Sequence, residues 1–114
     1  ETTTAVSHSQ IITHHPDTGK ELSGRTLPRW KEILEIAAKC YDMVGLGYLG
    51  VDIVLTKSGG PILLELNARP GLGIQIANTA GLLPRLEKIR SFLKDQRNHH
   101  IDASERAFYS MKSF

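Results

Sequence analysis

Two carboxylates and one amide interrupt the apolar stretch between residues 50 and 67. Asp52 lies in one apolar run, and Glu65 and Asn67 lie in the next. Because burying a carboxylate in a sheet is costly unless a cation or several donors neutralise it, these side chains need a partner. Mg²⁺ takes one or two carboxylates together with waters and substrate phosphates. The three residues therefore predict a magnesium site that holds the phosphates of a nucleotide.

The spacing of these residues allows them to converge. Glu65 and Asn67 are two residues apart, so on a strand their side chains share one face. The sequence Lys-Ser-Gly-Gly at 57–60 predicts a tight turn that brings the strand of Asp52 alongside. Glu65 is then the natural bridge between two ions, with Asp52 on one and Asn67 on the other. The alternative is that both carboxylates face solvent on an edge strand.

A guanidinium and a glycine-containing loop follow the second strand. Arg69 comes two residues after Asn67, where it could bind a phosphate or an acyl phosphate through two hydrogen bonds. Pro70 and Gly71 begin a loop whose backbone can approach a ligand closely and present N–H groups to an anion. A surface ion pair of Arg69 and a plain loop are the alternatives.

An α+β fold is expected to position these residues, with an antiparallel sheet packed by helices. Helical spacing predicts a helix that Thr26 caps, that holds Pro28 in its first turn and that Gly45 and Gly47 end. Strands over 48–56 and 62–67 should form an antiparallel hairpin covered on both faces, because their apolar residues do not alternate cleanly. We further expect a strand within 4–15, a turn at 14–20, one helical turn within 70–81, a helix over 82–93 and a terminal helix with a capping box at Asp102 and Glu105.

Composition narrows the class of protein. The 114 residues, 40% apolar and 23% charged, suffice for one small domain. A net charge of +2, with scattered basic residues, does not favour nucleic acid. No apolar run reaches the roughly 18 residues of a membrane span, and no signal peptide is visible. The single Cys40 indicates a reduced, cytoplasmic protein. Because the first residue is Glu, we expect a piece of a longer protein, although N-terminal processing would look the same.

Other reactive residues are interpreted as structural. His14 and His15 precede a proline turn and no cysteine joins them, so a transition-metal cluster is not favoured. Cys40 lies in a helical core pattern without an identifiable base, which argues against a nucleophile. Trp30 and Tyr41 recur at core spacing and are interpreted as packing residues.

The motif Asp52…Glu65-Leu-Asn67, followed by Pro70-Gly71, resembles the C-terminal metal-binding signature of the ATP-grasp superfamily. The longer strings at 46–54 and 64–78 resemble the alpha-L-glutamate ligase-like branch, relatives of the ribosomal-protein glutamate ligases. The resemblance runs from about residue 8 to residue 90. D-alanine ligases of the superfamily carry Arg two residues before the metal-binding Asp, whereas this chain has Gly50 there, which argues against that activity.

The resemblance implies a mechanism and roles for the site residues. ATP phosphorylates a substrate carboxylate, and an amine then attacks the acyl phosphate to form an amide. Two Mg²⁺ ions, or Mn²⁺ in their place, hold the ATP phosphates. By match, Asp52 and Glu65 bind one ion, and Glu65 and Asn67 bind the other. Arg69 is expected near the transferred phosphate, and Gly71 where the backbone approaches the reacting group.

The resemblance also implies a domain organisation. Residues 1–94 match the C-terminal portion of an ATP-grasp domain, and residues 95–114 form a polar linker and short terminal helix. The upstream lysines and flap that grip the nucleotide are absent, so we expect this chain alone to be inactive. The parent protein would join small-molecule or peptide carboxylates and amines. The alternative is a non-catalytic ATP-grasp-like module that binds partners or self-associates as a homo-oligomer.

Overall fold

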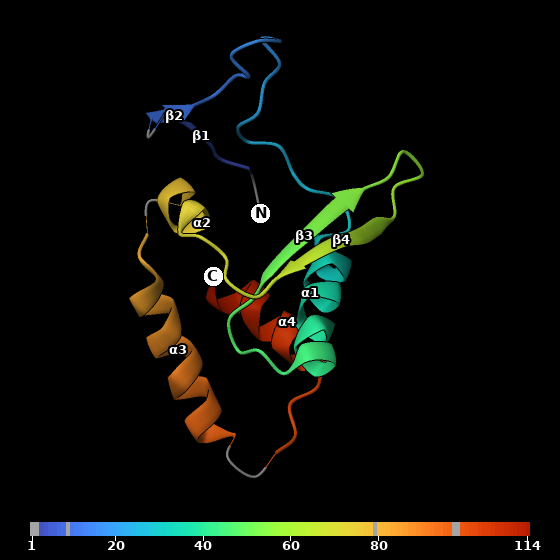
Figure 1. Cartoon of the computed structure of the whole chain (residues 1–114), viewed down its shortest axis with the longest axis vertical. Coiled ribbons are helices and arrows are strands. Elements are labelled where there is room, and N and C mark those ends of the chain that lie inside the picture. The colour runs from blue at the N-terminus through green and yellow to red at the C-terminus, as the bar shows by residue number, and fades with distance from the viewer. Residues whose placement is uncertain (1–2, 9, 79, 97–98) are drawn as a thin grey trace. The chain divides into compact units, whose positions relative to one another are not determined.

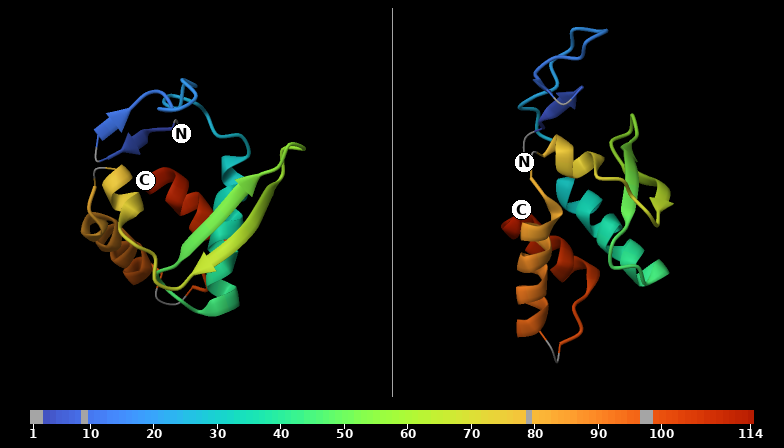
Figure 2. Two further views of the ribbon diagram at one scale, coloured as in Figure 1. Left: turned by 45° about the horizontal axis from the view of Figure 1, so that its top comes forward. Right: turned by 60° about the vertical axis from the view of Figure 1, so that its left-hand side comes forward.

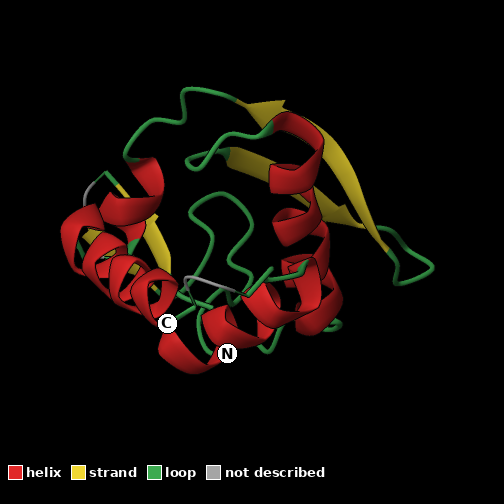
Figure 3. Ribbon diagram, turned by 90° about the horizontal axis from the view of Figure 1, so that it is seen from below, coloured by secondary structure: helices red, strands yellow, loops and turns green. Residues whose placement is uncertain are grey.

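Helices and separate two-stranded antiparallel sheets make up the chain, so the predicted α+β class is confirmed (Figures 1 and 3). The computed structural model describes residues 3–8, 10–78, 80–96 and 99–114. Contacts divide the chain into two units, one of residues 1–28 with 71–82 and one of residues 29–70 with 83–114. No helix among the described residues is long and apolar enough to cross a membrane.

The first unit contains a small hairpin and one short helix. Strands β1 (Ala5–Ser7) and β2 (Gln10–Ile12) pair antiparallel. The prediction of a single strand within 4–15 is therefore wrong, because His8 has φ of 47° and begins a reversal of the chain. The predicted turn at 14–20 is confirmed, since the Gly19 N–H donates to the His15 carbonyl at 2.9 Å. Helix α2 (Gly73–Ala77) is the helical turn expected within 70–81.

Helix α1 (Trp30–Val44) begins the second unit and starts later than predicted. Neither the Thr26 cap nor the place of Pro28 in the first turn is found. Arg29 is the N-cap residue instead, with φ of 56° and no side-chain cap bond. Its guanidinium binds the Glu32 carboxylate at 2.8 and 2.7 Å and the Gly59 carbonyl at 3.1 Å. These bonds tie the first turn of α1 to the hairpin that follows.

The end of α1 and the hairpin after it agree with the sequence. Gly45, with φ of 69°, ends the helix and donates its N–H to the Tyr41 carbonyl, as predicted. Strands β3 (Gly50–Leu55) and β4 (Pro61–Asn67) pair antiparallel through the expected turn. Figure 2 shows this hairpin lying alongside α1, and residues of both strands contact the helix.

A β-bulge explains why the apolar residues of the hairpin do not alternate. Asp52 pairs with Glu65 but Ile53 pairs with Leu63, so Leu64 is left without an opposite residue. Only one face of the hairpin packs on α1, and the prediction that both faces are covered is wrong. On the other face, which we call the outer face, Val54, Ile62 and Leu64 are 41%, 50% and 64% exposed.

Helices α3 (Leu82–Asp95) and α4 (Ala103–Ser113) complete the second unit. The capping box at the start of α4 is confirmed, with Asp102 and Glu105 bonding each other's backbone N–H groups at 2.8 and 2.9 Å. Ala103 and Ala107 are buried, as is Cys40 of α1, because small side chains let these two helices approach closely. Phe92 of α3 stacks on Tyr109 of α4 at 4.0 Å between ring centroids.

Candidate functional site

The two predicted carboxylates stand directly opposite each other across the hairpin. Asp52 on β3 and Glu65 on β4 are register partners, and both are exposed on the outer face. Directly opposed residues in an antiparallel pair have Cβ atoms about 4.5–5.5 Å apart. In the described part of the chain, no hydrogen bond or ion pair involves either carboxylate. Like charges in this position repel, so a cation bound between them would be favourable.

Asn67 lies on the same face, two residues beyond Glu65 and opposite Gly50. Its side-chain oxygen Oδ1 accepts the backbone N–H of Arg69 at 2.9 Å. This bond is an Asx turn, which fixes the amide, while the second lone pair of Oδ1 remains for a ligand. The register thus brings all three predicted metal ligands onto one exposed patch of sheet.

Gly50 makes the close fit around Asn67 possible. A Cβ atom at this position would lie 3.1 Å from the Pro70 Cβ and 3.2 Å from the Asn67 Cβ. From the sequence, Gly50 was used only as an argument against D-alanine ligase activity, and its close packing was not predicted. A glycine inside a strand is the signal that could have pointed to it, because it often marks a close approach of other chain segments.

Arg69 lies in the exposed loop after β4. Its guanidinium has no ion-pair partner within the ranges that the structure describes, so the alternative of a surface ion pair is not what is found. Gly71 belongs to the other unit and is described apart from these four residues. Among the described residues, no heavy atom lies within 4 Å of where a Cβ would be at Gly71.

The donor set fits Mg²⁺ or Mn²⁺ better than Zn²⁺ or Cu²⁺. Two carboxylates and one amide oxygen are hard ligands, and exposure of the face leaves room for waters and phosphates to complete the coordination. Over the described residues, no three His, Cys, Asp or Glu side chains gather as a metal cluster. An ion here would therefore depend on ligands from substrate and solvent as well as on Asp52, Glu65 and Asn67.

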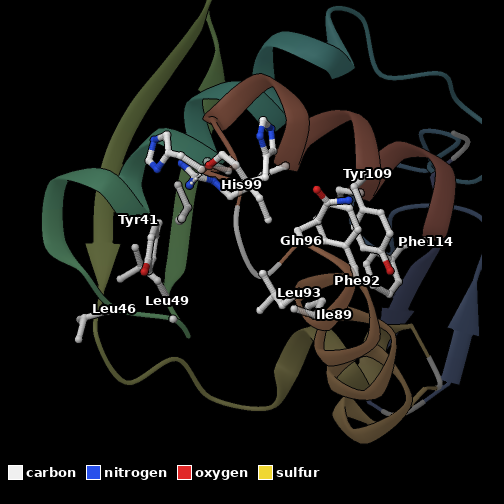
Figure 4. Close-up of a pocket in the computed structure, with 17 residues that line it drawn as sticks. Tyr41, Leu46, Leu49, Ile89, Phe92, Leu93, Gln96, His99, Tyr109 and Phe114 are labelled. Atoms are coloured by element: carbon white, nitrogen blue, oxygen red, sulfur yellow. Dashed lines mark hydrogen bonds between the residues drawn. The ribbon is translucent and has the colours of Figure 1, made fainter.

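A large pocket of the second unit lies elsewhere. Its volume is about 950 Å³, and it is lined by α1, α3, α4, the start of β3 with the loop before it, and the segment between α3 and α4. Figure 4 shows Phe92, Tyr109 and Phe114 gathered at one end, with Tyr41 and Leu49 apart from them. None of the predicted site residues lines it. Its lining is mostly apolar, unlike a site for phosphates.

Comparison with known proteins gives the class. A family described as sugar-transfer associated ATP-grasp matches residues 1–91, which is most of the chain. The chain belongs to this family, and the predicted ATP-grasp membership is confirmed.

One curated protein is similar to part of this chain. The chain is 40% identical over 65 residues to a probable alpha-L-glutamate ligase of Thioalkalivibrio sulfidiphilus (strain HL-EbGR7). The match covers 56% of this chain and 20% of the relative, so the chain spans about a fifth of that protein's length. No solved structure matches the chain.

Proposed function

We propose that this chain is the C-terminal part of an ATP- and Mg²⁺-dependent carboxylate–amine ligase. The product is an amide, formed through an acyl phosphate as in a glutamate ligase. The observation that carries the proposal is the pair Asp52 and Glu65, which oppose each other on an exposed sheet face with no cationic partner among the described residues, in a chain of the ATP-grasp family. Two carboxylates placed so are suited to an ion that is itself bound by phosphates.

Each residue of the site has a proposed role. Glu65 would hold both of two Mg²⁺ ions, Asp52 would bind the first and Asn67 the second. When bound, such ions would supply positive charge against the nucleotide phosphates, as metal ions usually do in phosphoryl transfer. Arg69, whose guanidinium has no ion-pair partner in the described ranges, binds the transferred phosphate or the acyl phosphate. Gly71 lets the backbone approach the reacting group.

The proposal is tested with Glu65→Gln in a longer protein that carries this segment. Glutamine keeps the size of the side chain but removes the charge that holds the ions. We expect ATP turnover to fall by at least about a hundredfold, which corresponds to about 2.7 kcal/mol of lost transition-state stabilisation. Glu87→Gln on the exposed surface of α3 is the matched control and should leave turnover unchanged. Turnover at the wild-type rate in Glu65→Gln contradicts the assignment.

One observation favours a second function. The outer face carries exposed apolar side chains at Val54, Ile62 and Leu64 beside the carboxylates. Such a patch is typical of a surface that contacts another protein part, so a non-catalytic binding module is the alternative. If Glu65→Gln leaves all measurable ATP chemistry of the longer protein unchanged while partner binding persists, this alternative is the better account.

A further inference from the structure

Gly50 is packed more tightly than most residues that carry a side chain. A Cβ there would meet Pro70 Cβ at 3.1 Å, Asn67 Cβ at 3.2 Å and the Asn67 carbonyl oxygen at 3.6 Å. Carbon atoms in contact prefer about 3.5–4.0 Å, so two of the three distances are too short. Nearby Gly47 is different, because nothing lies within 4 Å of its hypothetical Cβ.

The atoms that crowd Gly50 belong to the turn that carries the site. Asn67 Oδ1 accepts the Arg69 N–H at 2.9 Å, and Pro70 with its fixed φ follows directly. The turn over residues 67–70 is thus held at one side by this hydrogen bond and at the other by contact with the Gly50 backbone. It presents Asn67, a proposed metal ligand, and Arg69, a proposed phosphate ligand.

The presence of glycine at this position needs a reason, because glycine weakens a strand. It loses more backbone freedom on folding than other residues and has no side chain to pack. Gly50 lies at the first position of β3, and its backbone is not in the left-handed region that favours glycine. The close approach of Asn67 and Pro70 is the feature of this position that other residues cannot provide.

We infer that Gly50 is a positioning residue, which acts through Asn67 to set the metal and phosphate ligands of the outer face. The inference rests on the proposed function of that face. An added methyl group at residue 50 has no flexible side-chain end to push aside, since its neighbours are two Cβ atoms close to the backbone. The turn over 67–70 must then move by a few tenths of an ångström, away from residue 50.

The first test is spectroscopic and needs no metal. In the 114-residue chain, Gly50→Ala should shift the backbone amide proton signal of Arg69 upfield, because the bond to Asn67 Oδ1 lengthens. Gly47→Ala is the matched control and should leave that signal in place. An unchanged Arg69 signal in Gly50→Ala overturns the inference.

The second test measures Mn²⁺ affinity by electron paramagnetic resonance, with the ion alone as the probe. Gly50→Ala should weaken binding about tenfold, whereas the same substitution in an Asn67→Ala background should cause no further loss. Thermal unfolding of each variant checks that the fold is intact. Equal losses in both backgrounds would show that Gly50 does not act through Asn67, and would overturn the inference.

The two tests separate the inference from the function on which it rests. If the wild-type chain binds no Mn²⁺, or if Glu65→Gln binds it equally well, the proposed metal site is wrong. The Arg69 signal then decides alone whether Gly50 positions the turn. If Mn²⁺ binding depends on Glu65 but Gly50→Ala changes neither readout, the metal site stands and the positioning role of Gly50 is wrong.

Discussion

At the scale of single residues, the chemistry of the site follows from residue type. Asp52, Glu65 and Asn67 stand out in the sequence because carboxylates and an amide interrupt apolar strands. The structure places all three on one face of one hairpin. The contacts that hold these side chains in place could not be predicted. The packing at Gly50 and the hydrogen bond from the Arg69 N–H to Asn67 depend on the strand register and on the turn after β4.

Repulsion between the opposed carboxylates leads to a prediction about stability. In the presence of EDTA, Glu65→Gln should raise the free energy of unfolding by about 0.2–1 kcal/mol, because one of two like charges is removed. Urea denaturation measures this, with Glu87→Gln as the control that should have little effect. A loss of stability in Glu65→Gln would mean that the carboxylate makes a structural contact, contrary to its proposed role as an ion ligand.

At the scale of elements, most helices and strands could be predicted and their irregular points could not. Apolar spacing and the glycines identified both strands of the hairpin and the end of α1. The start of α1 was misplaced because Arg29 is held by Gly59, a residue 30 positions away along the chain. The helix propensities of neighbouring residues cannot predict a contact between residues so far apart in the sequence. The bulge at Leu64 could not be predicted for a similar reason, because it arises only when β4 pairs with β3.

The bulge assigns Leu63 and Leu64 to different environments, which mutation can test. Leu63 is half-buried toward α1, whereas Leu64 is exposed on the outer face. Leu63→Ala should lower the free energy of unfolding by about 1–2 kcal/mol, less than for a fully buried leucine. Leu64→Ala should change it by less than about 0.5 kcal/mol. Equal losses in the two variants, measured by urea denaturation, would contradict the register described here.

The capping box of α4 makes its stability depend on pH. The Glu105 carboxylate accepts the Asp102 N–H at 2.9 Å and contacts His99 Nε2 at 3.0 Å, which lowers the pKa of Glu105 below its ordinary value. Because the folded-state pKa is lower than the unfolded one, this contribution is present above about pH 4.3 and is lost as the pH falls through the lowered pKa.

We therefore expect α4 to loosen in acid. Helicity measured by circular dichroism, and the urea midpoint, should fall as the pH is lowered below about 4.3, and fall more in the wild type than in Glu105→Gln. Glutamine can still accept the Asp102 N–H but does not titrate in this range. A pH dependence that is identical in the two proteins would show that Glu105 is not responsible.

At the scale of the whole molecule, the motifs around Asp52, Glu65 and Asn67 were sufficient to predict the superfamily. The family match over residues 1–91 confirms this prediction, and the chain spans about a fifth of the length of the curated relative. The large pocket of the second unit contains none of the predicted site residues, so the nucleotide is proposed to bind on the open outer face. Its other contacts would come from parts of the longer protein.

Binding of nucleotide by the 114-residue chain tests this account most directly. Calorimetric titration with ADP and Mg²⁺ should release heat with the wild-type chain and with the Glu87→Gln control, because the metal ligands of the outer face are already in register. Glu65→Gln should abolish that heat. If the wild-type chain binds nothing, or if Glu65→Gln binds equally well, the outer face of this hairpin is not the metal and nucleotide site.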